Sequence, residues 1–237
     1  MKLQDIDIHF NVRTDSNGKD PDYASTTLKA YHKLLWIKPL PNGQIMELTN
    51  KDCSYLRWNY MYFGSDSIIV SFMHARYKLR NFIIDSIPNF WDYREDYQKK
   101  SYTIAGTIIF PKHWRSMNQE RGCCRKICDR WDLTLECIRY FYARKPTPLD
   151  KVMERDKAFY DLFVDFKGYV DFFFLQDCVD ENYNVKFWLD TPLWVSDPMP
   201  ESVESYKDWI DKELDFVAKR GKRIEEFCKK VFKYGTT

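Results

Sequence analysis

Three carboxylates recur at helical spacing in the middle of the chain, at Asp129, Asp132 and Glu136. At about 100° per residue they fall within about 80° of one another on a helix, together with Arg125 and Arg139. Carboxylates on one helix face can hold a divalent cation such as Mg²⁺, or act as general acid and base. The same pattern fits a solvated face of exposed ion pairs, or a buried ion network completed by cations from elsewhere in the chain. The three carboxylates are therefore the predicted catalytic residues, with their surroundings left open.

An Arg-Gly pair, Arg121 and Gly122, comes just before the helix expected around these carboxylates, and the first turn of that helix carries Arg125. Free N–H groups at a helix N-terminus attract anions, and arginines bind phosphate with two parallel hydrogen bonds. These three residues are the predicted phosphate-binding residues; a flexible turn with an exposed arginine is the other interpretation. The sequence contains no Walker pattern and no Gly-x-Gly-x-x-Gly fingerprint. The leading hypothesis is an intracellular enzyme or binding protein for a phosphorylated small molecule, such as a nucleotide.

A second set of carboxylates, Asp161 and Asp165, shares a face with Gly168 on a helix expected over residues 157–178. A glycine on that face allows a second helix or a ligand to approach closely. If this face meets the carboxylates of the preceding helix, the pattern is similar to the site of an all-helical, metal-dependent nucleotide hydrolase. The cofactor is otherwise unknown, and Mg²⁺ is the ion that such carboxylates would favour.

Cysteine and histidine do not form a metal-ligand pattern. Cys123, Cys124 and Cys128 contain no Cys-x2-Cys pair, and His113 is the only histidine near them in sequence. We therefore expect no zinc site here. His32 lies in an apolar run, where a hydrogen-bonded core residue is the expected role. Seven cysteines without a secretion signal predict reduced thiols and a cytoplasmic protein.

The composition is that of a globular protein rich in aromatic residues. Phe, Trp and Tyr make up 17% of the 237 residues, and such side chains bury large areas of surface. The formal net charge of +2 gives no general attraction to nucleic acid or to an acidic membrane. No apolar stretch approaches the ~20 residues that a membrane span needs. Neither a nucleic-acid partner nor a membrane is expected.

The N-terminal half is expected to contain strands. Residues 29–36 form an apolar run that we interpret as extended or buried, and Asn42 followed by Gly43 predicts a hairpin turn. Residues 56–63 are rich in aromatic side chains and predict another strand.

A helix and a central strand are expected next. Asp66 would cap a helix over residues 67–87, which ends before a proline. Residues 101–110 are apolar and β-branched and predict a strand, in which Gly106 allows another backbone to approach.

The C-terminal half is expected to be mainly helical. Gly221 marks an expected bend in its last helix, and residues 185–189 a short strand. The change from strands to helices favours an α+β fold over alternating α/β. We expect one domain over residues 1–237, with a mixed, strand-containing N-terminal half packed on the helical half. The helices are predicted from apolar residues at helical spacing, over residues 125–143, 149–155, 157–178 and 201–232.

Exposed aromatic residues offer an alternative function. Trp58, Trp91, Trp188 and Trp194 could bind a partner protein, because tryptophan contributes strongly to protein interfaces. On this hypothesis the chain is a non-catalytic interaction module and the charged residues are spread in solvent.

Eight segments, in order along most of the chain, carry a resemblance to a known family: residues 31–36, 38–43, 103–106, 108–111, 121–122, 129–139, 165–170 and 173–177. Through them the chain resembles a family of bacterial proteins known only as a domain of unknown function. The resemblance implies one domain and a bacterial or phage origin, and it implies no activity. At residues 118–120 the sequence Asn-Gln-Glu departs from the family's Asn-Gly-Ala.

Overall fold

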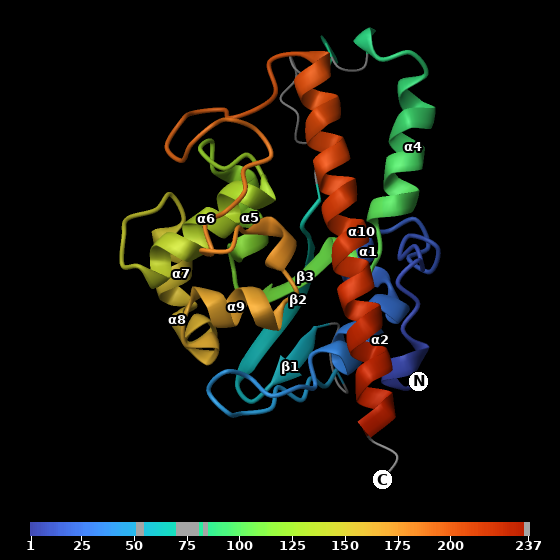
Figure 1. Ribbon diagram of the computed structural model, residues 1–237, viewed down its shortest axis with the longest axis vertical. Coiled ribbons are helices and arrows are strands. Elements are labelled where there is room, and N and C mark those ends of the chain that lie inside the picture. The colour runs from blue at the N-terminus through green and yellow to red at the C-terminus, as the bar shows by residue number, and fades with distance from the viewer. Residues whose placement is uncertain (51–54, 70–80, 83–84, 235–237) are drawn as a thin grey trace.

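The computed structural model of the protein describes residues 1–50, 55–69, 81–82 and 85–234 (Figure 1). Its elements in chain order, with η for a 3-10 helix, are η1 (Leu3–Asp5), α1 (Pro21–Ala24), α2 (Thr26–Leu35), β1 (Leu56–Trp58), β2 (Met61–Ser67), α4 (Phe90–Ser101), η2 (Ile104–Gly106), β3 (Thr107–Pro111), α5 (Met117–Cys123), α6 (Trp131–Tyr142), α7 (Asp150–Arg155), α8 (Lys157–Tyr160), η3 (Asp161–Phe163), α9 (Phe166–Phe172), η4 (Gln176–Cys178) and α10 (Val203–Tyr234).

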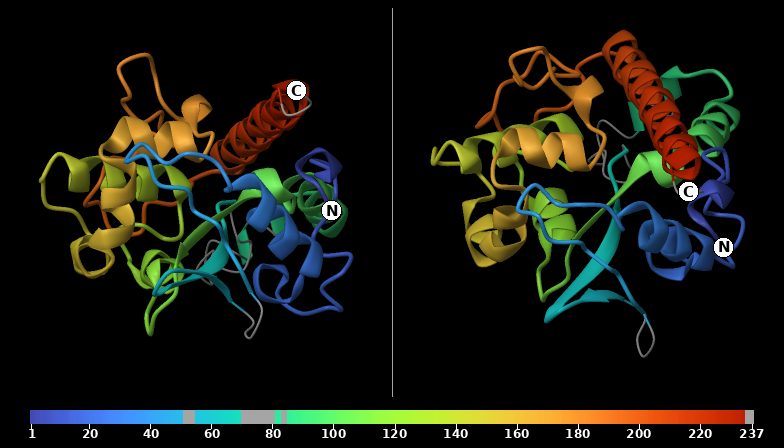
Figure 2. Two further views of the ribbon diagram at one scale, coloured as in Figure 1. Left: turned by 90° about the horizontal axis from the view of Figure 1, so that it is seen from below. Right: turned by 60° about the horizontal axis from the view of Figure 1, so that its bottom comes forward.

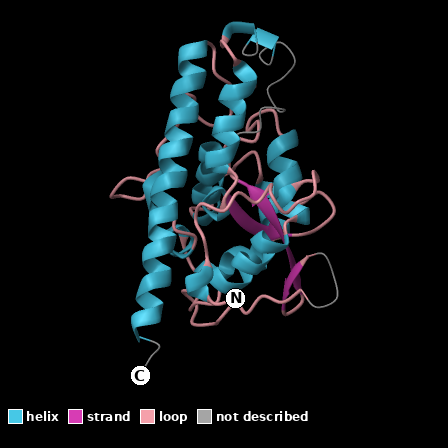
Figure 3. Cartoon of the chain, turned by 90° about the vertical axis from the view of Figure 1, so that its right-hand side faces the viewer, coloured by secondary structure: helices cyan, strands magenta, loops and turns pink. Residues whose placement is uncertain are grey.

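The expected α+β fold is confirmed. The strands form one antiparallel sheet in the order β1-β2-β3, and most of the chain after it is helical. Figures 1 and 2 show the sheet between one group of helices, α5 to α9, and a second group that contains α1, α2, α4 and α10. In Figure 3 the strands (magenta) are few and short beside the helices.

One edge of β2 is only partly covered. β1 pairs with β2 as far as Phe63, whereas β3 pairs with residues 63–67 of β2 on the other side. Among the described residues, no strand therefore covers residues 64–67 on the side of β1. The expected strand over residues 56–63 is wrong in extent, because Asn59 adopts a left-handed φ of 52° and turns the chain between β1 and β2.

The early apolar run is helical rather than extended. The side chain of Ser25 accepts a hydrogen bond from the amide of Leu28 and caps the N-terminus of α2. Tyr31, His32 and Leu35 then lie on the buried face of α2. The prediction of an extended run at residues 29–36 missed this cap and the helical spacing that follows it.

Two expectations around the central strands need correction. Asp66 lies inside β2 and caps no helix; residues 70–80 and 83–84 of the expected helix over residues 67–87 are outside the described part of the chain. The predicted strand over residues 101–110 is shorter at its start, because α4 extends to Ser101 and η2 follows it.

The helix expected over residues 125–143 begins only at Trp131. Cys128 and Asp129 have positive φ angles of 49° and 62°, which no residue of a right-handed helix can adopt. Asp129 therefore lies in a turn before α6 and does not share a helix face with Asp132 and Glu136.

The helix expected over residues 157–178 is broken into four short pieces, from α8 to η4. Val164 and Phe174 have φ angles of 68° and 56°, and each ends a helical segment. Between them, the side chain of Asp165 accepts a hydrogen bond from the amide of Gly168 and caps α9. The carboxylate face expected from Asp161 to Gly168 does not form as a continuous surface.

The remaining expectations are confirmed in part. A turn at Asn42 and Gly43 is confirmed, with Gly43 at a φ of 84°, although it joins only a single bridge between Pro39 and Ile45. The final helix is confirmed as α10 and continues through Gly221. Residues 185–189 form no strand; Val185 makes one isolated bridge.

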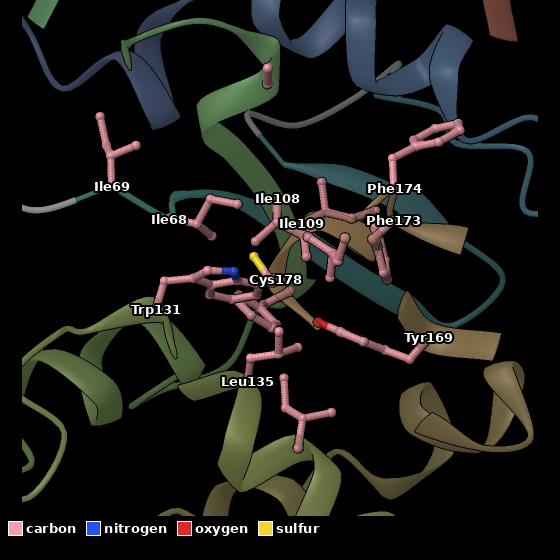
Figure 4. Packing of buried hydrophobic residues seen from close by; sticks show 14 of the residues in the cluster. Ile68, Ile69, Ile108, Ile109, Trp131, Leu135, Tyr169, Phe173, Phe174 and Cys178 are labelled. Atoms are coloured by element: carbon pink, nitrogen blue, oxygen red, sulfur yellow. The ribbon is translucent and has the colours of Figure 1, made fainter. Parts of the chain in front are cut away.

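Aromatic and aliphatic side chains from the sheet and the helices form the core. Figure 4 shows Trp131 and Leu135 of α6 together with Ile108 and Ile109 of β3 and with Phe173 after α9. Near this core, the fully buried guanidinium of α10 residue Arg220 donates to three backbone carbonyl oxygens, those of Phe173, Ala105 and Thr107, at 2.7–3.0 Å. Arg220 thus links α10 to the region around η2 and β3 and to the residue that follows α9.

Gly106 and Gly221 differ sharply in the space around them. A Cβ atom at Gly106 would lie 2.0 Å from the carbonyl oxygen of Ser101, so the expected close backbone approach is confirmed. A Cβ atom at Gly221 would only touch Ile8 and Ala105, at 3.5 and 3.7 Å.

Gly106→Ala should therefore destabilise the protein by roughly 1–3 kcal/mol or more, since backbone must move to admit the methyl group. Gly221→Ala is the matched control and should stabilise by roughly 0.5–1 kcal/mol, because alanine favours the helix. Urea unfolding measures both. Equal effects of the two substitutions would contradict this packing.

Lys38 lies in a cage of aromatic rings beside α9 and α10. Its Nζ atom is 3.6 Å from the ring centroid of Phe174 and 4.6 Å from that of Phe172, and it donates a hydrogen bond to the carbonyl oxygen of Phe172. Burial, together with the charge of Arg220, lowers the pKa of Lys38 to about 7. The rings and the carbonyl oppose this effect, because both favour the ammonium form.

A lysine whose pKa is lowered on folding binds its proton less tightly in the folded state. Between pH 7 and pH 10 the unfolded chain then holds more protons at Lys38 than the folded one, so this group makes stability rise with pH. Lys38→Met should remove that contribution. Urea unfolding at several pH values should show wild-type stability gaining on the variant as pH rises; a constant difference would refute the lowered pKa.

Candidate functional site

A pocket of about 910 Å³ opens at the uncovered edge of β2. Residues 63–67 of β2 form one wall. Residues from α1 and α2 form a second wall, beside the edge of β2 that no described strand covers. The third side comes from α5 and from the turn before α6. Four carboxylic residues line it, Asp20, Asp22, Asp66 and Asp129, together with two lysines, Lys29 and Lys112.

Asp22 of α1 occupies the place that a neighbouring strand would take. Its Oδ2 accepts hydrogen bonds from the amide and the hydroxyl of Ser67, at 3.0 and 2.9 Å. Its Oδ1 accepts from the hydroxyl of Ser65, at 3.0 Å. Burial, followed by the charge of Asp20, raises the pKa of Asp22 to about 6. The α1 segment reaches this place because the Asp20 side chain and Pro21 begin a helix there.

His32 continues this chain of hydrogen bonds into the core. The indole N–H of Trp36 donates to Nδ1 of His32, at 3.0 Å. Burial and the charge of Arg220 lower the pKa of His32 to about 3, so the ring is neutral and its proton must sit on Nε2. Nε2 lies 3.1 Å from the hydroxyl oxygen of Ser65 and therefore donates to it. In this tautomer His32 does not accept the Ser65 proton, which goes to Asp22 instead. The expected hydrogen-bonded core histidine is confirmed.

Arg121 lies behind the opposite wall and is fully buried. Its Nη1 atom is 2.7 Å from Oδ2 of Asp66 and 3.3 Å from Oδ1 of Asp129. Nη1 also donates to the carbonyl oxygen of Ser67 at 3.1 Å. Nε donates to the hydroxyl of Thr134 and Nη2 to the carbonyl oxygen of Asp129, at 3.1 and 2.8 Å. Burial raises the pKa of Asp66, and the adjacent guanidinium of Arg121 opposes this shift and favours the ionised carboxylate. One cation thus fixes two carboxyl groups of the pocket wall.

The three predicted phosphate-binding residues do not converge. Arg121 lies in the last turn of α5 instead of before a helix, and its donors are used by protein oxygens. Arg125 is exposed and pairs with Asp197 at 2.5 Å. Gly122 lines the pocket.

The three predicted catalytic carboxylates have separate surroundings. Asp129 lines the pocket, whereas Asp132 and Glu136 do not. Asp132 is fully enclosed and accepts from Arg130 and from the amide of Trp188. Glu136, 5% exposed, pairs with Arg139 at 2.6 Å. The first eight residues of α6 are all buried, so these two carboxylates do not lie on a solvated face. Their partners Arg130 and Arg139 belong to the same segment, whereas the buried-network interpretation expected cations from elsewhere in the chain. Their catalytic role stays a prediction.

Metal ligands do not cluster in the described part of the chain. No three His, Cys, Asp or Glu side chains there could hold a metal ion together. Cys123, Cys124 and Cys128 line the pocket, and the thiol of Cys128 donates a hydrogen bond to the carbonyl oxygen of Arg125 at 3.4 Å. No helix among the described residues is long and apolar enough to cross a membrane.

The four tryptophans expected on the surface differ in their exposure to solvent. Trp91 and Trp194 are exposed, Trp58 is half-buried, and Trp188 is only 5% exposed and belongs to the core. Trp114, which the sequence did not single out, is 87% exposed. The alternative function as a protein-interaction module stays a prediction, but Trp188 is too buried to be one of its contact residues.

Sequence reasoning missed most of the pocket. Asp22, Asp66 and the two lysines were not predicted site residues. A signal was present in the two serines that alternate with Asp66 along an otherwise apolar strand, because small polar residues at alternating positions point to a polar partner beside the sheet. The partner itself, Asp22, is 43 residues away from Ser65 and carries no local signal.

The chain belongs to a family of unknown function (DUF6994), whose model matches residues 6–224 of the 237. This confirms the resemblance to a family without an assigned activity. No curated protein and no solved structure matches the chain.

Replacing Arg121 tests the network behind the pocket. Arg121→Met should destabilise the protein by roughly 3–5 kcal/mol at neutral pH, because Asp66 and Asp129 lose their buried cation. Arg125→Met is the matched control, and the exposed pair with Asp197 predicts a change below about 1 kcal/mol. Urea unfolding measures both. A loss at Arg121 no larger than that at Arg125 would contradict the network.

Proposed function

We propose that the protein binds a phosphorylated small molecule that also carries hydroxyl groups, such as a nucleotide or a sugar phosphate, in the pocket beside β2. The observation that supports this most is that two lysines, each beside one of the paired rings of Tyr23 and Tyr55, line the same pocket as four carboxylic residues. Its volume of about 910 Å³ falls in the range of small-molecule sites. Since the family assigns no activity, the proposal rests on the pocket itself.

The carboxyl groups that line the pocket suit the hydroxyl end of such a molecule. Asp66 and Asp129 are held by Arg121, and Asp22 by serines, so their orientations are set before a ligand arrives. Carboxylate oxygens accept hydrogen bonds strongly, and an acceptor fixed in advance binds at a lower entropic cost.

The lysines supply positive charge for the phosphate. Lys29 Nζ lies 5.3 Å from the ring centroid of Tyr23, and Lys112 Nζ lies 5.4 Å from that of Tyr55. These two tyrosine rings pack edge to face, with their centroids 6.0 Å apart. The ammonium groups and the rings thus form one surface, which can receive a phosphate and an adjoining flat ring. Phosphate binding moves in this proposal from the predicted arginines to the lysines.

Of the three predicted catalytic carboxylates, only one is placed for acid–base chemistry in the pocket. Asp129 lines the pocket and can contact a ligand, whereas Asp132 and Glu136 are enclosed by their arginines outside it. We therefore retain Asp129 as the predicted carboxylate that contacts the ligand.

The proposal is tested by thermal shift and calorimetry with AMP, ADP, ATP, ribose 5-phosphate, adenosine and inorganic phosphate, each with and without Mg²⁺. At least one phosphorylated compound should raise the melting temperature more than adenosine does. Lys112→Met should weaken its binding roughly tenfold or more, the usual effect of losing a charged hydrogen bond.

Lys157→Met is the matched control, since this exposed lysine of α8 pairs with Asp161 and does not line the pocket. It should bind like the wild type. Failure of every phosphorylated compound to stabilise the protein would refute the proposal. So would equal effects of the two lysine substitutions.

A further inference from the structure

The carboxyl groups of the pocket differ in what holds them. Asp66 and Asp129 share the charged guanidinium of Arg121. Asp22 is held by two hydroxyls and one amide, all of them neutral. Protonating Asp66 or Asp129 weakens an ion pair with a buried cation, whereas Asp22 can gain or lose a proton without disturbing a charged partner.

The hydrogen bonds that lead to Asp22 all run in one direction. Trp36 donates to His32, His32 to Ser65, and Ser65 to the carboxylate of Asp22. Trp36 and His32 have no exposed surface, and the Trp36 ring packs against Phe173 with centroids 5.0 Å apart. The chain therefore begins in the rigid aromatic core and ends on an oxygen in the pocket wall.

We propose that Asp22 is the titrating hydrogen-bond acceptor that the pocket presents to its ligand, and that Trp36, His32 and Ser65 are positioning residues that hold its carboxylate in place. The part concerning the ligand rests on the proposed function; the part concerning the positioning chain does not. A hydroxyl of the ligand donates to Asp22 in its ionised form, and protonation of Asp22 weakens that contact.

Other charged groups near Asp22 favour its neutral form. Asp20 lies at the start of the same helix, and Asp66 follows Ser65 on β2; both repel the carboxylate. Tyr102, after α4, and Lys29 of α2 line the same pocket. With its pKa raised to about 6, Asp22 is mainly ionised at pH 7.5 and mainly protonated at pH 5. Ligand binding should therefore fall as pH decreases through 6.

The positioning chain is tested on the full protein without ligand. Carbon-13 NMR of labelled aspartate carboxyl groups gives the pKa of Asp22, with Asp22→Asn identifying its signal. Ser65→Ala should raise this pKa by about one unit, because the carboxylate loses a donor. Ser65→Thr keeps the hydroxyl and should restore the wild-type value. Ser205→Ala lies at the start of α10, away from the pocket, and should leave the pKa of Asp22 unchanged.

A wild-type pKa near the ordinary value of about 4, or an unchanged value in Ser65→Ala, would overturn the positioning chain.

The acceptor role is tested with the phosphorylated compound that binds best in the thermal-shift and calorimetry experiment. Its affinity should fall about tenfold from pH 7.5 to pH 5 in the wild type and stay nearly constant in Asp22→Asn. Binding that is equally pH-dependent in both proteins would overturn this role and leave the proposed function standing. If no compound binds at any pH, the acceptor role fails with the proposed function, and the NMR titration still decides the positioning chain.

Discussion

A guanidinium group with no access to water must find its hydrogen-bond acceptors inside the protein, and this requirement at Arg121 organises the region around the pocket. Its acceptors come from β2, from the turn before α6 and from α6 itself. Because all of them must reach one planar group, the three segments cannot shift independently. The wall formed by Asp66 and Asp129 is therefore as rigid as the core behind it.

The opposite wall depends on an unusual use of a sheet edge. Uncovered strand edges invite pairing with other chains, and proteins commonly cover them or place charges on them. Here the carboxylate of Asp22 takes hydrogen bonds from Ser65 and Ser67 at the edge of β2 and leaves space beside it. A full strand at this position would form hydrogen bonds with the same backbone edge of β2, and it would fill the pocket. The cavity and the protected edge thus have the same structural cause.

The sequence predicts the fold class well and the site poorly, for different physical reasons. Apolar spacing is a local property, so α10 and the α+β arrangement follow from it. The break at Cys128 and Asp129 has no local signal, because neither residue is glycine and their left-handed conformation is imposed by contacts such as that between Arg121 and the Asp129 carbonyl. The pairing of Asp66 with Arg121 joins residues 55 positions apart. Charges on a helical wheel cannot reveal such partners.

The buried contacts of Arg220 have a consequence for how the protein is made. The carbonyl oxygens of Ala105, Thr107 and Phe173 receive this guanidinium inside the fold, and it is encoded more than a hundred residues after the first of them. While the ribosome is still translating the segments in between, those oxygens can be satisfied only by water, so the core around them cannot close. Completion of the native state must therefore wait until α10 has been synthesised and has emerged from the ribosome.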